Sequence, residues 1–186
     1  MRFLISLPAL LLLLIAGCAQ VPPSPVPAPT SSQSRAVVFD VDGTLTPDVL
    51  AITEVRANAA KAVGMYAEQG YKIVYLSVRI QGFQAELPAW LKENGFPDGS
   101  IHVSQASKPD EFKAGILNEY KAKGWILVGA YGDSETDFAA YAKADIPKNR
   151  VFALKRRGWL DCTEGVYREC LAGWTEHLTF ISNPTD

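Results

Sequence analysis

The feature that most constrains this chain is the regular alternation of short apolar runs with segments of helical periodicity. Nearly continuous apolar strands are typical of a parallel sheet that helices cover on both faces. The predicted strands are residues 36–40, 72–78, 100–104, 125–132 and 150–154. The predicted helices are residues 53–69, a shorter one from Pro88, 109–124 and 134–144. The sequence therefore predicts an α/β, Rossmann-like domain with a five-stranded parallel sheet.

Most of the predicted strands end beside a side chain that can take part in chemistry. Ligands of such sheets bind beyond the carboxyl ends of the strands, at the topological switch point. We therefore expect one rim of the sheet to collect Asp40, Asp42, Ser77, Lys108, Asp133 and Asp137.

The carboxylates of this set indicate a bound cation. Asp40 and Asp42 follow an apolar run, where two carboxylates lose water and repel each other unless something compensates them. No His or Cys accompanies them, and oxygen ligands favour Mg²⁺. Lys108 and the Ser77 hydroxyl suit phosphoryl oxygens. The set predicts phosphoryl transfer, with a carboxylate as the nucleophile.

Four motifs stand in an order that is similar to that of the haloacid-dehalogenase (HAD) phosphatase superfamily. They are "DVDGT" (40–44), Ser77, Lys108 and "GDSETD" (132–137), and the resemblance spans residues 36–155. It implies Asp40 as the nucleophile and Asp42 as the general acid and base. The implied metal ligands are Asp40, Asp133 and the backbone carbonyl of Asp42. The implied roles of the other residues are phosphoryl binding by Ser77 and Lys108, substrate binding by Gly43 and Thr44, and support of Lys108 or of the metal's waters by Asp137.

A narrower resemblance concerns the substrate. The segments "GYKIVYLSVR" (70–79) and "AYAKADIPKNRVF" (140–152) look like the catalytic half of lipin-type phosphatidate phosphatases. That resemblance implies Mg²⁺-dependent release of phosphate from phosphatidate-like lipids, with Arg79 contacting the substrate. Ordinary helices and strands fill the intervals between the motifs, which predicts an open site without a large cap domain.

Two alternatives remain open. One is a phosphatase for soluble phosphomonoesters such as nucleotides or sugar phosphates. The other is a phosphatidate-binding module without turnover, as in related domains of phosphatidylinositol-transfer proteins, which lack the catalytic acids. This chain keeps both Asp40 and Asp42, which favours catalysis.

The N-terminus predicts export and anchoring. Residues 1–17 have the pattern of a signal peptide, and "IAGC" resembles the bacterial lipoprotein lipobox, which implies lipidation of Cys18. The next residue is Ala19 rather than Asp, which favours the outer membrane, facing the periplasm. Residues 18–34 are rich in Pro and Ser and predict an extended linker. Residues 35–186 form the predicted phosphatase domain with its tail.

Composition excludes one class of partner. The formal net charge is -2, and "KRRG" at 155–158 is the one basic cluster, so nucleic-acid binding is not expected. The cluster is typical of a solvated loop, with a contact to phosphate or a lipid headgroup as the alternative. Cys162 and Cys170 are expected to form a disulfide in an oxidising compartment. We also expect a short helix at 167–174 and a structural role for His102.

Overall fold

The computed structural model describes residues 24–183, so the predicted signal peptide and Cys18 lie outside the described residues. No helix in the described part is long and apolar enough to cross a bilayer. The elements in chain order are β1 (Arg35–Phe39), α1 (Ala59–Glu68), β2 (Lys72–Val78), η1 (Gln81–Phe83), α2 (Leu87–Glu93), β3 (Ser100–Ser104), α3 (Pro109–Ala122), β4 (Ile126–Gly132), α4 (Glu135–Lys143), η2 (Lys148–Arg150), β5 (Val151–Leu154), β6 (Glu169–Leu171) and α5 (Leu178–Ser182).

The strands form one sheet in the order β3-β2-β1-β4-β5-β6, and every neighbouring pair is parallel. The chain runs outward from β1 to β3 and then returns through α3 to β4. The topological switch point therefore lies between β1 and β4, and ligands of such sheets bind beside it. This arrangement confirms the α/β, Rossmann-like fold.

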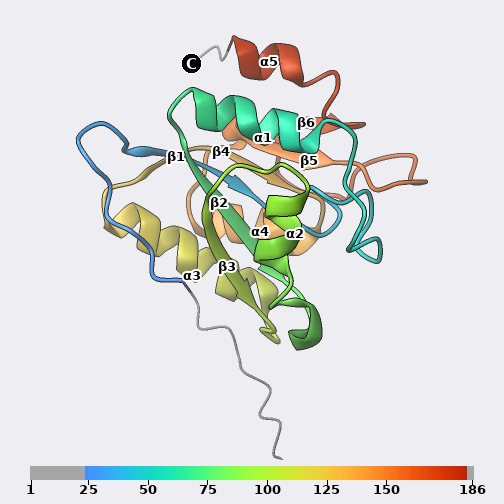
Figure 1. Cartoon of the computed structure of the whole chain (residues 1–186), viewed down its shortest axis with the longest axis horizontal. Helices are drawn as coiled ribbons and strands as arrows, with labels where there is room; N and C mark the ends of the chain where they lie inside the picture. The colour runs from blue at the N-terminus through green and yellow to red at the C-terminus, as the bar shows by residue number, and fades with distance from the viewer. Residues whose placement is uncertain (1–23, 184–186) are drawn as a thin grey trace, which may run out of the picture.

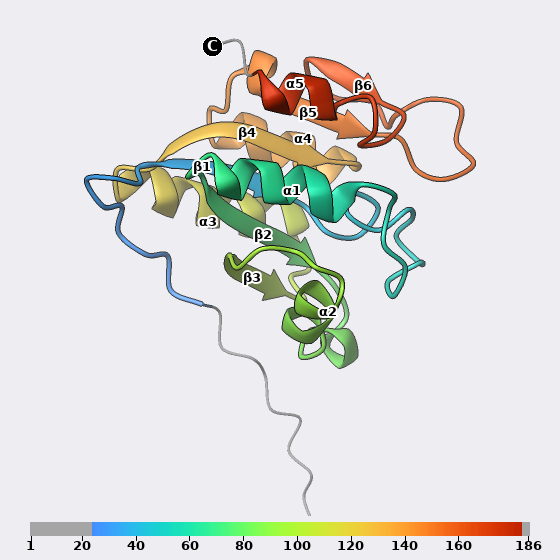
Figure 2. The same ribbon diagram turned by 45° about the horizontal axis from the view of Figure 1, so that its top comes forward.

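Alternate residues of the strands serve two separate cores. On one face, Val37 and Phe39 of β1 pack with buried side chains of α1, α2 and α5. On the other face, Ala36 and Val38 pack with α3 and α4. Figures 1 and 2 show these helices as layers on the two sides of the sheet. Because both faces are covered, the polar groups that reach the sheet must collect at its rim.

The sheet has six strands rather than the predicted five. The helix predicted at 167–174 is wrong, because Glu169–Leu171 forms β6 and pairs with β5 in the register Phe152↔Glu169. The open edge of β5 offers backbone groups that this segment satisfies. The tail nevertheless packs on the core, since Trp174 is fully buried against Phe39 and Tyr131.

The helix predicted from residue 53 begins later, at Ala59. Asn58 has a left-handed φ of 61°, which interrupts a right-handed helix. Residues 45–58 instead form turns beside the carboxyl ends of the strands. As a result, side chains from this loop reach the rim where the predicted site lies.

The Pro-rich segment contacts the domain. Residues 24–30 form no helix or strand, and Val26 is buried in the α3 face of the core, so part of the predicted linker packs on the domain. Trp125 Nε1 donates to the carbonyl of Pro27 at 2.8 Å, and Lys123 Nζ donates to that of Val26. The sequence did not predict these contacts, which lie at the end of the sheet opposite to the rim.

The predicted disulfide is confirmed. Cys162 and Cys170 are bonded, with their Cα atoms 5.8 Å apart. The bond ties the loop after β5 to β6. His102 is also as expected, because it is buried and its Nε2 lies 3.0 Å from the Tyr120 hydroxyl.

Removal of this disulfide should lower the free energy of unfolding. A loop of this length predicts a loss of roughly 2–3 kcal/mol, because the unfolded chain regains freedom. Urea unfolding of the wild type with and without reductant measures the effect. The double variant C162A/C170A is the control and should not respond to reductant. A wild type whose midpoint is the same in both conditions would contradict the prediction.

Candidate active site

The first predicted motif forms a tight turn at the end of β1. The backbone N–H of Asp40 donates to the carbonyl of Tyr131 at 2.9 Å, which extends the pairing of β1 with β4. Gly43 follows with a φ of +91°. A Cβ atom at Gly43 would lie 2.1 Å from Asp133 Oδ2, so only glycine lets the turn approach that carboxylate. The role of Gly43 seen here is thus to bring the first and fourth motifs together.

A buried arginine that the sequence did not predict holds this turn in place. Arg56 is 8% exposed and donates to the carbonyls of Gly43 at 2.6 Å and Lys155 at 2.8 Å. It also reaches the carbonyls of Thr46 and Pro47. The guanidinium thereby joins the turn after β1 to the end of β5. Its five fixed donors suit such a set of backbone acceptors.

The lysine at the centre of the site is Lys113. Its Nζ donates to Asp40 Oδ1 at 2.6 Å and to Asp137 Oδ1 at 2.5 Å, and all three side chains are nearly inaccessible to solvent. Burial acts against the charged lysine, but Asp137 and Asp40 outweigh it and raise the pKa of Lys113 above its ordinary value. Lys113 therefore stays protonated between the two aspartates.

Lys108, the lysine predicted from the sequence, does not reach the site. It precedes α3 with a side chain that is 67% exposed, and it pairs with Glu111 at 2.9 Å. The expectation for Lys108 is wrong because the residue sits before the helix that carries the functional lysine inward. The sequence held a usable signal, since position 113 lies four and seven residues before Leu117 and Tyr120 on the apolar face of that helix.

Asp42 is held by the end of β2. Ser77 Oγ donates to Asp42 Oδ2 at 2.7 Å, and Arg79 binds both carboxylate oxygens at 3.0 and 2.5 Å. The side chain of Asp42 is 13% exposed, so it faces the pocket while its position is fixed. The structure therefore brings Ser77 and Arg79 to the site, where both contact Asp42.

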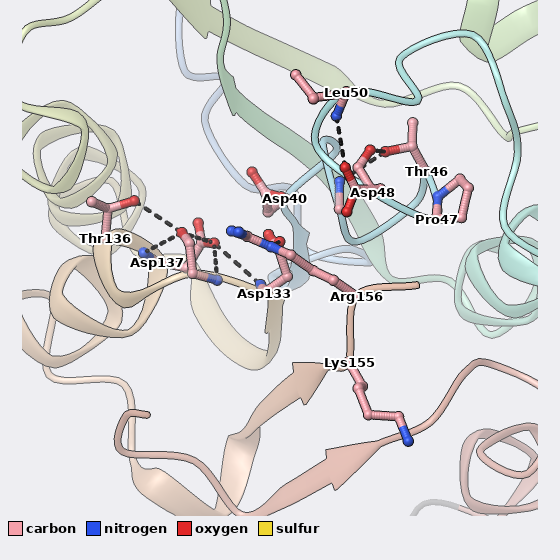
Figure 3. Close-up of polar contacts among 12 residues, drawn as sticks. Asp40, Thr46, Pro47, Asp48, Leu50, Asp133, Thr136, Asp137, Lys155 and Arg156 are labelled. Atoms are coloured by element: carbon pink, nitrogen blue, oxygen red, sulfur yellow. Dashed lines mark hydrogen bonds and ion pairs between the residues drawn. The ribbon is translucent and has the colours of Figure 1, made fainter. Parts of the chain in front are cut away.

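Asp133 and Asp137 occupy the start of α4. Asp137 Oδ2 accepts from the backbone N–H groups of Asp133 and Ser134 and from the Ser134 hydroxyl, which closes a capping box. Asp133 Oδ2 accepts from Arg156 Nε, a residue of the basic cluster that follows β5. Figure 3 shows Arg156 extending toward these acids, whereas its neighbour Lys155 points away.

The predicted contact of Thr44 with substrate is not seen. Thr44 is fully buried, and its hydroxyl has no partner among residues 24–183. Neither Thr44 nor Gly43 lines the pocket. The threonine follows the tight turn and points into the protein, so its side chain is placed for packing.

Carboxylates are crowded at this rim. Those of Asp40, Asp42, Asp133 and Asp137 lie beside Lys113, Arg79 and Arg156, and the charge of Arg56 also acts on Asp133. Burial, followed by repulsion from Asp137, raises the pKa of Asp40 well above its ordinary value, although Lys113 acts in the opposite direction. Burial and Asp137 likewise raise the pKa of Asp133 to about 6, against the effect of Arg156. One more positive charge would favour the ionised forms of Asp40 and Asp133.

The donor atoms fit a hard cation. Asp40, Asp133 and Asp137 each offer a carboxylate oxygen, and these oxygens lie within 4.8 Å of one another. Asp40 Oδ2 is buried without a hydrogen-bond partner in the described residues, whereas both oxygens of Asp137 are already engaged. Asp40 and Asp133 are therefore the residues that would hold Mg²⁺, and Asp137 would orient Lys113 and the turn.

A pocket of about 500 Å³ opens above these acids. Its polar floor includes Asp40, Asp42, Lys113 and Asp133. Apolar side chains from the loop after β1 and from the end of β2 to η1 form part of its wall, and these are Val49, Leu50, Ile52, Val78, Ile80 and Phe83. Several of them remain open to solvent, with Leu50 88% and Ile80 60% exposed. The site thus combines a charged floor with an apolar entrance.

The family model described as "PITM 1-3, LNS2 domain" matches residues 37–155. Protein retinal degeneration B of Drosophila melanogaster is 27% identical over 132 residues, which cover 67% of this chain and 10% of that protein. Phosphatidate phosphatase LPIN3 of Homo sapiens is 27% identical over 157 residues, which cover 68% of this chain and 18% of that protein. The chain thus spans less than a fifth of the length of these relatives.

Solved structures show the same fold. D,D-heptose 1.7-bisphosphate phosphatase from B. bronchiseptica, complexed with magnesium and phosphate, aligns with a TM-score of 0.56 and 14% identity, covering 82% of this chain and 99% of that one. A structure from Mesorhizobium loti that is described as a HAD-like phosphatase aligns with a TM-score of 0.60 and 13% identity, covering 86% and 88%.

Lys113→Met should destabilise the protein far more than Lys108→Met. The first variant leaves two buried carboxylates without their shared cation, which predicts a loss of about 3–5 kcal/mol. The second removes an exposed lysine and should stay within about 0.5 kcal/mol of the wild type. Urea unfolding followed by circular dichroism gives both values. Equal effects of the two variants would contradict the placement of Lys113.

Asp40→Asn should stabilise the metal-free protein in a pH-dependent way. Because the folded-state pKa of Asp40 is raised, the unfolded chain ionises first as the pH rises above about 4, which destabilises the wild type. The advantage of the variant should therefore grow with pH until Asp40 ionises in the folded state, by about 1.4 kcal/mol for each pH unit in this range. Thermal unfolding with a chelator, from pH 4 to pH 8, measures it. A pH-independent difference would argue against the raised pKa.

Proposed function

We propose that this chain, which belongs to the LNS2 domain family described for PITM 1-3, is a Mg²⁺-dependent phosphatase that releases phosphate from phosphatidate-like lipids. One observation carries the proposal. Asp40 lines a pocket whose entrance is apolar, and its Oδ2 is a buried carboxylate oxygen without a hydrogen-bond partner in residues 24–183. A nucleophile below an apolar entrance suits a phosphomonoester that carries acyl chains.

Asp40 is the proposed nucleophile. Lys113 holds Oδ1, which leaves Oδ2 as the oxygen proposed to attack the substrate. Attack by Oδ2 on phosphorus forms an O–P bond and breaks the bond from phosphorus to the alcohol oxygen of the substrate, which leaves an aspartyl-phosphate on Asp40. The charge of Lys113 stays beside the reacting group throughout and offsets the charge of the phosphoryl oxygens.

Asp42 is the proposed general acid and base. In its acid form it gives a proton to the departing alcohol oxygen, and the resulting carboxylate then takes a proton from the water that hydrolyses the aspartyl-phosphate. Phosphate is released and Asp40 is regenerated. Ser77 and Arg79 fix the position of Asp42, and Arg79 also lines the pocket, where an anionic substrate would be in reach. The contact of Arg79 with substrate stays a prediction, and its contact with Asp42 is a second role beside it.

Asp40 and Asp133 would hold Mg²⁺, which would neutralise phosphoryl oxygens and favour the ionised form of both carboxylates. The cluster of carboxylate oxygens within 4.8 Å of one another supports this assignment. The structural relative that contains magnesium and phosphate shares the fold, and a relative of similar sequence is a phosphatidate phosphatase by name. Both likenesses support the proposal.

Lipidation of Cys18, a signal peptide at 1–17 and a place in the periplasm at the outer membrane remain part of the proposal. They rest on the resemblance of "IAGC" to a lipobox. An anchored enzyme would meet a phospholipid substrate in the membrane that holds it. The substrate is then a membrane component, and no nucleic acid is involved.

The apolar entrance gives a specific test of the lipid substrate. Ile80→Asn should raise the KM for phosphatidate about tenfold, which corresponds to the loss of one exposed apolar contact of about 1.4 kcal/mol. The same variant should leave the KM for a small aryl phosphate unchanged. Ile126→Asn is the matched control, because Ile126 is 50% exposed at the amino end of β4 and does not line the pocket.

The assay measures phosphate release with Mg²⁺ from phosphatidate, lysophosphatidate, a nucleotide and an aryl phosphate, with Asp40→Asn as the blank. Selective release from the two lipids is expected. Release from the soluble esters alone would keep the catalytic residues and reject the lipid substrate. Phosphatidate binding without release, equal in wild type and Asp40→Asn, would replace the proposed enzyme with a binding module.

A further inference from the structure

Arg156, like Lys113, is a basic side chain of the pocket that was not among the predicted site residues. Its Nε donates to Asp133 Oδ2, and its guanidinium lies 5.0 Å from the centre of the Trp159 ring. The side chain is 17% exposed and that of Asp133 is 2% exposed, so the pair is largely shielded from water. In Figure 3 the arginine reaches across the strand ends to the acids. The contact is therefore a largely buried ion pair within the site.

Asp133 is also one of the acids that can hold a cation. A divalent ion and a guanidinium on the same carboxylate repel each other, and this repulsion is strong where water is largely excluded. Asp137 cannot replace Asp133 as the ligand, because Lys113 and the capping box already occupy its two oxygens. The metal and Arg156 would thus bind the same carboxylate, that of Asp133.

We propose that Arg156 is a competing cation, which neutralises Asp133 while the metal is absent and leaves it when the metal binds. Arg156 lines the pocket, so the released guanidinium stays within reach of the anionic group of a substrate. One side chain then couples metal binding to recognition of the anionic substrate. This inference rests on the proposed function, because it requires a metal at Asp133.

The test measures binding of Mg²⁺ to the full chain by isothermal titration calorimetry, without substrate. Arg156→Gln removes the competitor and should lower the Kd for Mg²⁺ on the order of tenfold. Arg156→Lys keeps the charge and should stay close to the wild type. Arg157→Gln is the matched control, because Arg157 is the next residue, carries the same charge and pairs with Glu54 at 2.6 Å instead. Its Kd should not change.

A second measurement uses proteins in which Arg156 is unchanged, so it does not depend on whether Arg156→Gln folds. Since the guanidinium lies over Trp159, its departure should alter the fluorescence of that indole when Mg²⁺ is added to the wild type. Trp159→Phe should lose this part of the signal while it still binds Mg²⁺. A Mg²⁺ response of equal size in both proteins would show that Arg156 does not move, which overturns the proposal even if Arg156→Gln fails to fold.

The failures of the two proposals are distinguishable. A wild type that binds Mg²⁺ and releases phosphate, together with an unchanged or higher Kd in Arg156→Gln, overturns the competition and leaves the phosphatase intact. A higher Kd would mean that Arg156 merely positions Asp133 as a ligand. A wild type that does not bind Mg²⁺ overturns the proposed function and, with it, the role of Arg156.

Discussion

The ion pairs of Lys113 with Asp40 and Asp137 are the interaction on which the rest of this site depends. A buried carboxylate is costly unless a charge and hydrogen bonds compensate it, and Lys113 compensates two at once. It links β1 through Asp40 to α4 through Asp137, and it comes from α3 between them. The lysine thus fixes the distance between the first and the fourth motif, and it leaves one oxygen of Asp40 free to react.

Each of the other acids has its own basic partner, which compensates the charge of that acid. Asp42 is held by Arg79, and Asp133 by Arg156. Because Lys113 is shared, Asp40 and Asp137 have one lysine between them. Burial and the neighbouring Asp137 raise the pKa of Asp40 and of Asp133, and a cation at these two groups would favour their ionised forms. Asp40, Asp133 and Asp137 are themselves buried, which strengthens their charge interactions.

Much of the fold and part of the site could be predicted from the sequence for physical reasons. Apolar runs must be buried, so the strands and their ends could be predicted from the sequence. The same reasoning predicted the residues at those ends, which are Asp40, Asp42, Ser77 and Asp133. Strand β6 was missed because three residues, of which two are exposed, carry no periodic signal. Lys113 was not predicted because Lys108 lies nearer to the end of the strand, whereas Lys113 lies on the apolar face of the helix that follows. Arg156 was missed because a basic cluster after a strand looks the same whether it faces water or a buried acid.

The central role proposed for Asp40 is that it carries the phosphoryl group during the reaction. The direct measurement is mass spectrometry of the full chain after rapid acid quenching, with Mg²⁺ and phosphatidate present. We expect one added phosphoryl group on the peptide that contains Asp40, which is absent from Asp40→Asn and is lost on treatment with hydroxylamine. Release of phosphate by Asp40→Asn at a rate close to that of the wild type, or a phosphoryl group on another residue, would contradict the account.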